Sequence, residues 1–207
     1  MRKIFRDRNY ENVNKFLFPG GGYGIPEIAP EIYTECEWIG FNYAASRKIG
    51  RGNMGIHFYL DDYQFLRLWN MPDYYLPMLQ QFKYVLSPDF SIYADFPFAV
   101  QIFNHYRKHW IAAYLQLHGV KVIPSIAWSD ESSYEWCFEG EPTYGTVSVS
   151  SVGTQLNKLS KRLFAEGYQE MMRRLKPEKI LFFGTVPEEC DGNIVQINAF
   201  QQKFREE

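Results

Sequence analysis

Short apolar runs alternate with longer segments of helical spacing from about residue 55 to the end of the chain. Each run contains mainly aliphatic, β-branched or aromatic residues, which is typical of strands buried on both faces. Because the intervening segments are long enough for helices, the pattern predicts βαβ units with parallel strands and right-handed crossovers. The predicted strands cover residues 56–60, 84–86, 120–123, 146–149, 180–183 and, more weakly, 194–197.

Two of the connections have a strong helical period. Between Pro97 and Gly119, apolar residues recur every three or four positions, and both end residues suit the limits of a helix. Residues 156–175 repeat leucine and methionine at the same steps, with lysine and arginine on the other side. Both segments are predicted to be long helices that cover a sheet.

The other segments are less regular. Residues 63–82 have helical spacing, but Pro72 and Pro77 are expected to divide them into two pieces, because proline interrupts the hydrogen bonds of a helix. Residues 132–140 have room for one short turn or helix only. Residues 1–54 are rich in glycine, proline and scattered charges, and they are predicted to be loop-rich.

The predicted fold class is α/β, a single domain with a mostly parallel sheet of about six strands flanked by helices. We expect residues 1–54 to form an irregular N-terminal segment packed on an α/β core of residues 55–207, so that there is one structural domain overall. A small barrel, closed like a TIM barrel, is the alternative. An open sheet is favoured because a TIM barrel usually has eight strands and about 250 residues.

Composition narrows the class of protein. The chain has 207 residues, with 22 lysines and arginines against 24 aspartates and glutamates, and its net charge is −2. Proteins that bind polyanions in general usually carry a basic excess, so this balance argues against that class. A hydrophobic content of 46% also excludes long disorder.

The sequence predicts a cytoplasmic protein. No stretch approaches the roughly 20 apolar residues of a membrane-spanning helix, and the apolar residues 16–18 are too few for a signal peptide. The three cysteines, Cys36, Cys137 and Cys190, are odd in number and far apart, which favours reduced thiols over disulfides or a cysteine zinc site. No membrane partner is therefore expected.

Polar residues follow the predicted strands directly. The carboxyl ends of parallel strands share one edge of the sheet, and α/β proteins bind their ligands at that edge. We therefore predict a site there. The predicted catalytic residues are Asp89, Asp130 and Glu131, and the predicted ligand-binding residues at the strand ends are Asp62, Ser87, Ser91, Trp128 and Ser150. Asn104 and Arg107, on the polar side of the helix between Pro97 and Gly119, are also predicted to bind the ligand, because Arg107 could reach a phosphate at this edge.

The alternative for any single one of these residues is a capping role, because Asp and Ser after a strand commonly cap the following helix. If Asp89 and Asp130 act together, their carboxylates suit Mg²⁺ or a general acid and base pair. No cofactor is established by the sequence, and Mg²⁺ is the one that it suggests. His105 and His109 have a spacing that can chelate a metal, but no third ligand is evident, so we expect surface or flanking residues.

Several of these segments resemble the domain-of-unknown-function family numbered 4417, over about residues 25–184. The resemblance rests on Phe58-Tyr59-Leu60-Asp61-Asp62, Ser87-Pro88-Asp89-Phe90-Ser91, Gln101-Ile102-Phe103-Asn104 and Trp128-Ser129-Asp130-Glu131. The resemblance implies no particular activity. It implies a context, because members occur in Firmicutes, their plasmids and their phages, so a role as an accessory or counter-defence protein in the host-cell cytoplasm is expected.

Three functions follow as hypotheses. The first is a small-molecule site for a nucleotide or related phosphorylated ligand. In this hypothesis Arg107 contacts the phosphate and Trp128 stacks on the ligand. Any enzyme activity would be of the hydrolase or phosphate-ester type. The second is inhibition of a host protein through exposed aromatic residues of the N-terminal segment: Tyr23, Tyr33, Trp38, Phe41 and Tyr43. The third and least favoured is nucleic-acid binding through Arg47, Lys48, Arg51 and the basic face of residues 158–176.

Overall fold

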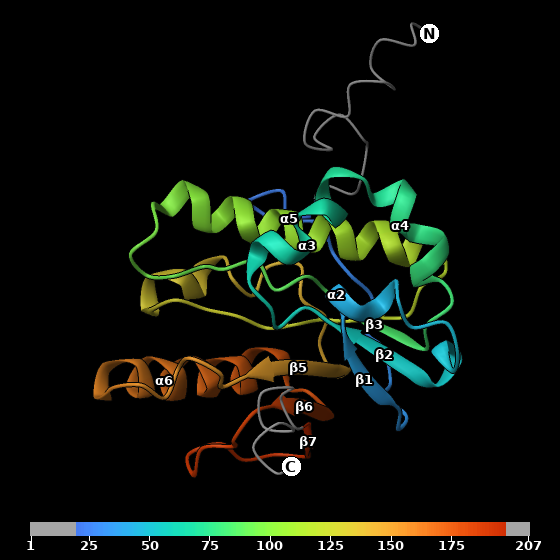
Figure 1. Cartoon of the computed structure of the whole chain (residues 1–207). Helices are drawn as coiled ribbons and strands as arrows, with labels where there is room; N and C mark the ends of the chain where they lie inside the picture. Colours follow the sequence, from blue (N-terminus) through green and yellow to red (C-terminus); the bar gives the residue numbers. More distant parts are fainter. Residues whose placement is uncertain (1–19, 198–207) are drawn as a thin grey trace, which may run out of the picture.

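The computed structural model describes residues 20–197 (Figure 1). Its strands are β1 (Glu37–Gly40), β2 (Met54–His57), β3 (Tyr84–Leu86), β4 (Val122–Ile123), β5 (Thr146–Ser150), β6 (Lys179–Phe183) and β7 (Ile194–Ile197). Its helices are α2 (Phe41–Ala44), α3 (Asp62–Asn70), α4 (Pro72–Leu79), α5 (Phe98–Leu117) and α6 (Lys158–Leu175). Short 3-10 helices cover Arg51–Asn53 (η1) and Glu131–Glu135 (η2).

All strand pairs are parallel, and the strand order follows the chain. One sheet has the order β1-β2-β3-β4 and the other β5-β6-β7. A parallel bridge between Ser125 and Ser148 joins the two sheets, where Ser148 N donates to the Pro124 carbonyl at 2.8 Å. Within residues 20–197 no ladder pairs β7 with β1. Every strand therefore ends at the same edge of the assembly, as the βαβ pattern predicts.

The predicted α/β class is confirmed, and each of the six predicted strands overlaps an observed one. The structure adds a seventh, β1, within the segment that was expected to be irregular. That expectation was wrong at Glu37–Gly40, which pairs with Met54–His57, so a boundary at residue 54 cuts through a sheet. The four-residue run Glu-Trp-Ile-Gly is too short and too little buried to produce a strand signal. Residues 1–19 lie outside the described residues.

The long helices α5 and α6 lie where the periodicity predicts them. The break between α3 and α4 falls at Met71, and Pro72 takes the first position of α4, where a missing N–H costs nothing. Pro77 was also expected to break the segment, but it lies inside α4. None of the helices among the described residues is long and apolar enough to span a bilayer.

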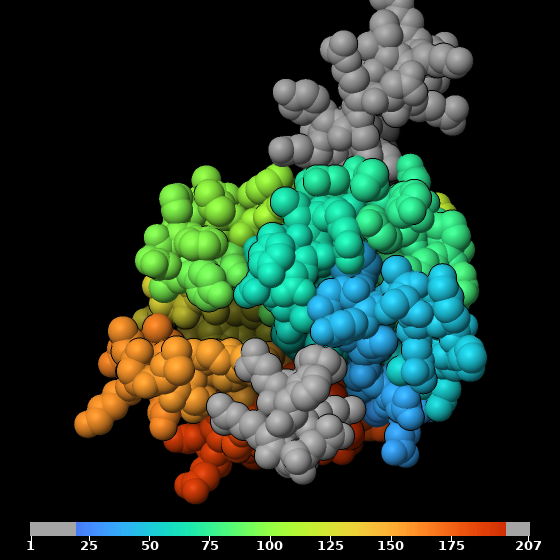
Figure 2. Space-filling view, in the orientation of Figure 1, coloured from blue at the N-terminus to red at the C-terminus, as the bar shows by residue number. Residues whose placement is uncertain are grey.

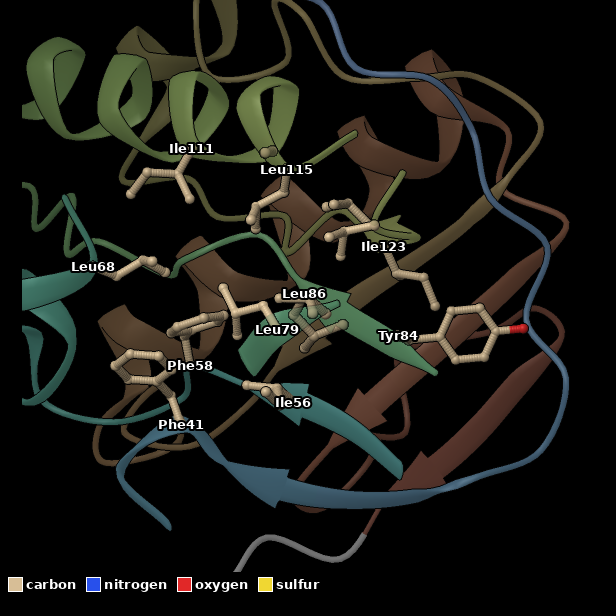
Figure 3. Packing of buried hydrophobic residues seen from close by; sticks show 14 of the residues in the cluster. Phe41, Ile56, Phe58, Leu68, Leu79, Tyr84, Leu86, Ile111, Leu115 and Ile123 are labelled. Carbon is tan, nitrogen blue, oxygen red and sulfur yellow. The ribbon is translucent and has the colours of Figure 1, made fainter. Parts of the chain in front are cut away.

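Two apolar clusters form the core. The larger lies between the first sheet and α3, α4 and α5; Figure 3 shows Ile111 and Leu115 of α5 above Leu86 and Ile123 of the sheet. The smaller lies between the second sheet and α6. Phe183 of β6 belongs to the larger cluster, because its ring contacts Trp38, His57 and Tyr59 at centroid distances of 5.7, 5.3 and 4.7 Å. It thus packs the second sheet against the first.

Replacing Phe183 with alanine should lower the free energy of unfolding by about 3–5 kcal/mol, because a buried aromatic side chain leaves a cavity between the sheets. Chemical denaturation measures this loss. Leu156→Ala is the control, since Leu156 is 84% exposed and its change should stay within about 0.5 kcal/mol. Equal effects of the two variants would contradict the packing role of Phe183.

Candidate functional site

A cleft of about 690 Å³ opens at the carboxyl ends of the strands. In Figure 2 a recess separates the orange surface of α6 from the green surface around α5. The loops after β2, β3, β4 and β5 and the start of α6 line the cleft. Its polar lining residues are Tyr59, Asp61, Gln64, Asp89, Ser91, Ser129, Ser150, Thr154 and Ser160, and its aromatic ones include Phe90, Tyr93, Trp128 and Phe164.

Asp89 is the most unusual of the lining residues. Its side chain is only partly accessible, and among the described residues no donor makes a hydrogen bond to its carboxylate. Burial raises the pKa of Asp89 to about 7, against the opposing charge of Lys108 and with a further rise from the Asp62 carboxylate. A carboxyl group that titrates near neutral pH can accept or donate a proton at the cleft.

The loop that carries Asp89 is held from both sides. The Asp62 carboxylate, in the first turn of α3, accepts hydrogen bonds from Ser91 N (3.2 Å) and Ser91 Oγ (2.9 Å). Asn104 Nδ2 of α5 donates to the Ser91 carbonyl, and the Arg107 guanidinium donates to Asn104 Oδ1. The Arg107 guanidinium also lies 4.0 Å from the centre of the Phe90 ring. These contacts fix the backbone directly after Asp89.

Ser87, at the start of the same loop, is buried beneath the cleft and does not line it. Ser125 N donates to Ser87 Oγ and Ser125 Oγ donates to the Ser87 carbonyl, both at 2.8 Å. The carbonyl of Ser125 in turn accepts from Lys108 Nζ at 3.0 Å. Ser87 therefore joins the ends of β3 and β4, which is a structural role.

Trp128 forms part of a wall of the cleft and is fixed against α6. Its indole Nε1 donates to the Leu163 carbonyl at 3.1 Å, and its ring lies 5.4 Å from that of Phe164. A Cβ at Gly167 would lie 2.1 Å from Trp128 Nε1. The helix thus needs a glycine at this position to admit the indole.

The predicted residues therefore divide into three groups. Asp89, Ser91, Trp128 and Ser150 line the cleft, and Asp62, Asn104 and Arg107 brace its loop. Asp130 and Glu131 do not line the cleft. Asp130 caps η2, with its carboxylate bonded to Ser132 N (3.0 Å) and Ser132 Oγ (2.6 Å), so the geometry gives no support to an Asp89–Asp130 metal pair.

The prediction missed other lining residues. Asp61 directly follows the predicted strand of residues 56–60, so the same strand-end rule could have selected it. Gln64, Leu163 and Phe164 lie on helices, where the sequence gives no sign of which turn faces the strand ends. No Lys, Arg or His among the described residues lines the cleft, so its formal charges are the carboxylates of Asp61 and Asp89.

His105 and His109 are buried, contrary to the expectation of a surface or flanking position. His105 Nε2 donates to the Glu139 carbonyl and His109 Nδ1 to the Pro26 carbonyl. Glu141 lies beside them, with one ligand atom from each of the three within 4.8 Å of the others. A carboxylate 32 positions further along the chain than His109 could not be recognised from helical spacing.

This cluster contains its own cation. The Lys108 ammonium pairs with the Glu141 carboxylate, and His109 Nε2 lies 3.0 Å from the same oxygen. Although burial opposes ionisation of Glu141, Lys108 and His109 hold its pKa below the usual value. Lys108 thus supplies the positive charge that a metal ion would otherwise bring, and we assign the cluster a structural role.

Several residues of the surfaces predicted to bind protein or nucleic acid make contacts within the fold instead. Tyr33 and Phe41 are buried, which contradicts their predicted exposure, whereas Tyr23 and Tyr43 are exposed. Arg51 donates to Gln81 Oε1 and to two backbone carbonyls. Three arginines of α6 form ion pairs with neighbouring glutamates: Arg162, Arg173 and Arg174.

Comparison with known proteins identifies the class. The chain belongs to the family described as a domain of unknown function, DUF4417, whose profile matches residues 19–201. It is 33% identical over 188 residues to the Gene 1 protein of Mycobacterium phage D29, covering 90% of this chain and 70% of that protein. It is 35% identical over 190 residues to the Gene 1 protein of Mycobacterium phage L5, covering 91% and 83%. No solved structure matches.

The comparisons confirm the predicted family and its association with phages. They assign no activity, so the predicted roles of the cleft residues rest on the geometry given above.

Asp89→Asn should change the pH dependence of stability. The folded protein keeps the Asp89 proton up to about pH 7, whereas an unfolded chain releases it near pH 4. Stability should therefore fall as the pH rises from about 4 to about 7, and the asparagine variant should escape that loss. Between about pH 4 and 8, the difference in unfolding free energy should move by up to about 4 kcal/mol in favour of the variant. Denaturant titrations at several pH values measure it, and a constant difference would contradict the buried carboxyl.

Asp62→Asn should lower the free energy of unfolding, which is opposite to the change that Asp89→Asn should produce at higher pH. This carboxylate accepts hydrogen bonds from Ser91 N and Ser91 Oγ, and an amide removes part of that accepting capacity. We expect a loss of about 1–3 kcal/mol at neutral pH, measured in the same denaturant titrations. An unchanged stability would show that Asp62 does not hold the Asp89 loop.

Proposed function

We propose that this protein is an accessory protein of a mobile element that binds a nucleotide or related phosphorylated small molecule in the cleft, with Asp89 as the polar anchor. The observation that carries the proposal is the Asp89 carboxylate itself, which faces the cleft and receives no hydrogen bond from the described residues. Because this carboxylate is partly accessible at the cleft, a ligand donor can bond to it without breaking a hydrogen bond of the fold.

The position and lining of the cleft support a ligand of this kind. It lies at the carboxyl ends of parallel strands, where α/β proteins commonly bind small molecules. Its volume falls in the range of small-molecule sites, and it combines aromatic walls with a few convergent polar groups. Aromatic rings such as Trp128 offer faces on which a planar base can stack.

Binding alone and binding followed by hydrolysis are both within this proposal. If a phosphate ester or related bond is broken, Asp89 is the candidate for general acid or base, because burial places its pKa at about 7. Mg²⁺ enters the proposal only as an ion that accompanies the phosphate, since Asp130 is used as a cap. The two lining carboxylates available to such an ion are Asp61 and Asp89.

A thermal-shift screen tests the proposal directly. Purified protein is mixed with nucleosides, nucleotides, cyclic and linear oligonucleotides, NAD derivatives and sugar phosphates, each with and without Mg²⁺. A true ligand at 100 times its dissociation constant should stabilise the protein by about 2.7 kcal/mol. For a domain of this size that is a rise of about 5–10 °C in melting temperature.

The ligand effect should disappear in Asp89→Asn and persist in Glu188→Gln, a matched change of an exposed acid outside the cleft. The absence of stabilisation by every compound would contradict the proposed function. A ligand effect that survives in Asp89→Asn would place the binding site elsewhere.

A further inference from the structure

We infer that the cleft holds the ring of its ligand rather than the phosphate, and that Asp89 accepts a hydrogen bond from an amino group on that ring. The inference rests on the proposed function and deepens it, because it names the chemical class that the cleft selects. With Asp89 on the ring and the phosphate outside, it restricts that function to binding. The ligand is then an amino-bearing heterocycle, such as a cytosine or adenine nucleoside, whose phosphate stays outside.

The first argument is the charge of the cleft. Its formal charges come from Asp61 and Asp89, and no basic side chain among the described residues lines it. A phosphate beside these carboxylates would meet like charge in a partly desolvated site. An amino group has hydrogen atoms to donate and no negative charge, so it complements the ionised form of Asp89.

The second argument is that the two cations packed around the Asp89 loop, Arg107 and Lys108, already have partners. The Arg107 guanidinium donates to Asn104 Oδ1 and lies over the Phe90 ring at 4.0 Å. The Lys108 ammonium is buried, pairs with Glu141 and donates to the Ser125 carbonyl. Bringing either cation to a phosphate in the cleft would break contacts that hold the fold together. These groups therefore support the loop around Asp89 and leave the cleft without a phosphate clamp.

The third argument is the shape of the walls. Trp128 is fixed against α6 by the bond from its Nε1 to the Leu163 carbonyl and by the space that Gly167 leaves. A fixed indole loses little conformational entropy when a planar ring stacks on it. Phe90 and Tyr93 contribute further aromatic surface from the loop that carries Asp89. The cleft thus brings aromatic surface and an accepting carboxylate together, which suits a flat heterocycle with an amino group.

Calorimetric titrations with matched nucleosides test this inference. Cytidine is compared with uridine and adenosine with inosine, since each pair differs by an amino group in place of a carbonyl oxygen and by the hydrogen that the carbonyl form carries on the neighbouring ring nitrogen. The titrations are run without Mg²⁺ at about pH 8, where most Asp89 is ionised. The amino nucleoside should bind at least about tenfold more tightly in at least one pair, which is typical of a hydrogen bond to a charged group. The dissociation constant of its 5′-monophosphate should lie within about threefold of that of the amino nucleoside.

Two variants test which residues produce the preference for the amino nucleoside. Asp89→Asn should remove the tenfold preference, whereas Gly167→Ala should weaken both members of a pair alike, because an added methyl group displaces the indole. Trp128→Leu serves as a second test of the wall if Gly167→Ala does not fold.

The outcomes separate the inference from the proposed function. If nucleotides bind but nucleosides do not, or if uridine and inosine match their amino partners, the inference is overturned while the proposed function stands. If no nucleoside or nucleotide binds with or without Mg²⁺, both are overturned. Binding that prefers the amino form and depends on Asp89 supports both.

Discussion

The buried ammonium of Lys108 is the interaction on which the arrangement of the cleft depends. From the middle of α5 it bonds the Ser125 carbonyl just after β4 and pairs with Glu141 before β5. Glu141 also contacts His109, whose Nδ1 holds the Pro26 carbonyl of the N-terminal segment. The cation thus joins three separate parts of the chain, and its neighbour His109 adds the N-terminal segment as a fourth. Removing it would leave the Glu141 carboxylate buried without its main partner, which commonly costs 3–5 kcal/mol.

This anchoring determines where Asp89 lies. Ser125, held by Lys108, bonds Ser87, and Ser87 begins the loop that carries Asp89. The far side of that loop is held by Asp62 and Asn104 through Ser91. The polar side chains of this region therefore bond to one another or to the backbone, and the Asp89 carboxylate is left facing the cleft. A braced loop that presents the Asp89 carboxylate to the cleft is the physical basis of the ligand site that we propose.

The sequence was sufficient for the fold class and for the edge of the sheet where the cleft lies, because burial on both faces produces continuous apolar runs and parallel strands end at one edge. It could not separate residues that face the cleft from residues that cap a helix. Asp89 and Asp130 both follow strands, yet Asp130 bonds Ser132 two residues away and Asp89 bonds none of the described residues. The Lys108 cluster was also hidden, since its partners Ser125 and Glu141 are distant in sequence and only the tertiary fold brings them together.

The pKa of Asp89 is the most direct test of this account, because the whole proposal depends on a carboxyl group that the fold desolvates and leaves without a donor. Carbon-13 NMR of the labelled protein, with Asp89→Asn to assign the signal, measures it across the range from acidic to alkaline pH. The account predicts a titration near pH 7 in the free protein. A titration near the ordinary aspartate value of about 4 would show that Asp89 is solvated or already hydrogen-bonded, and it would contradict the assignment of the cleft as its ligand site.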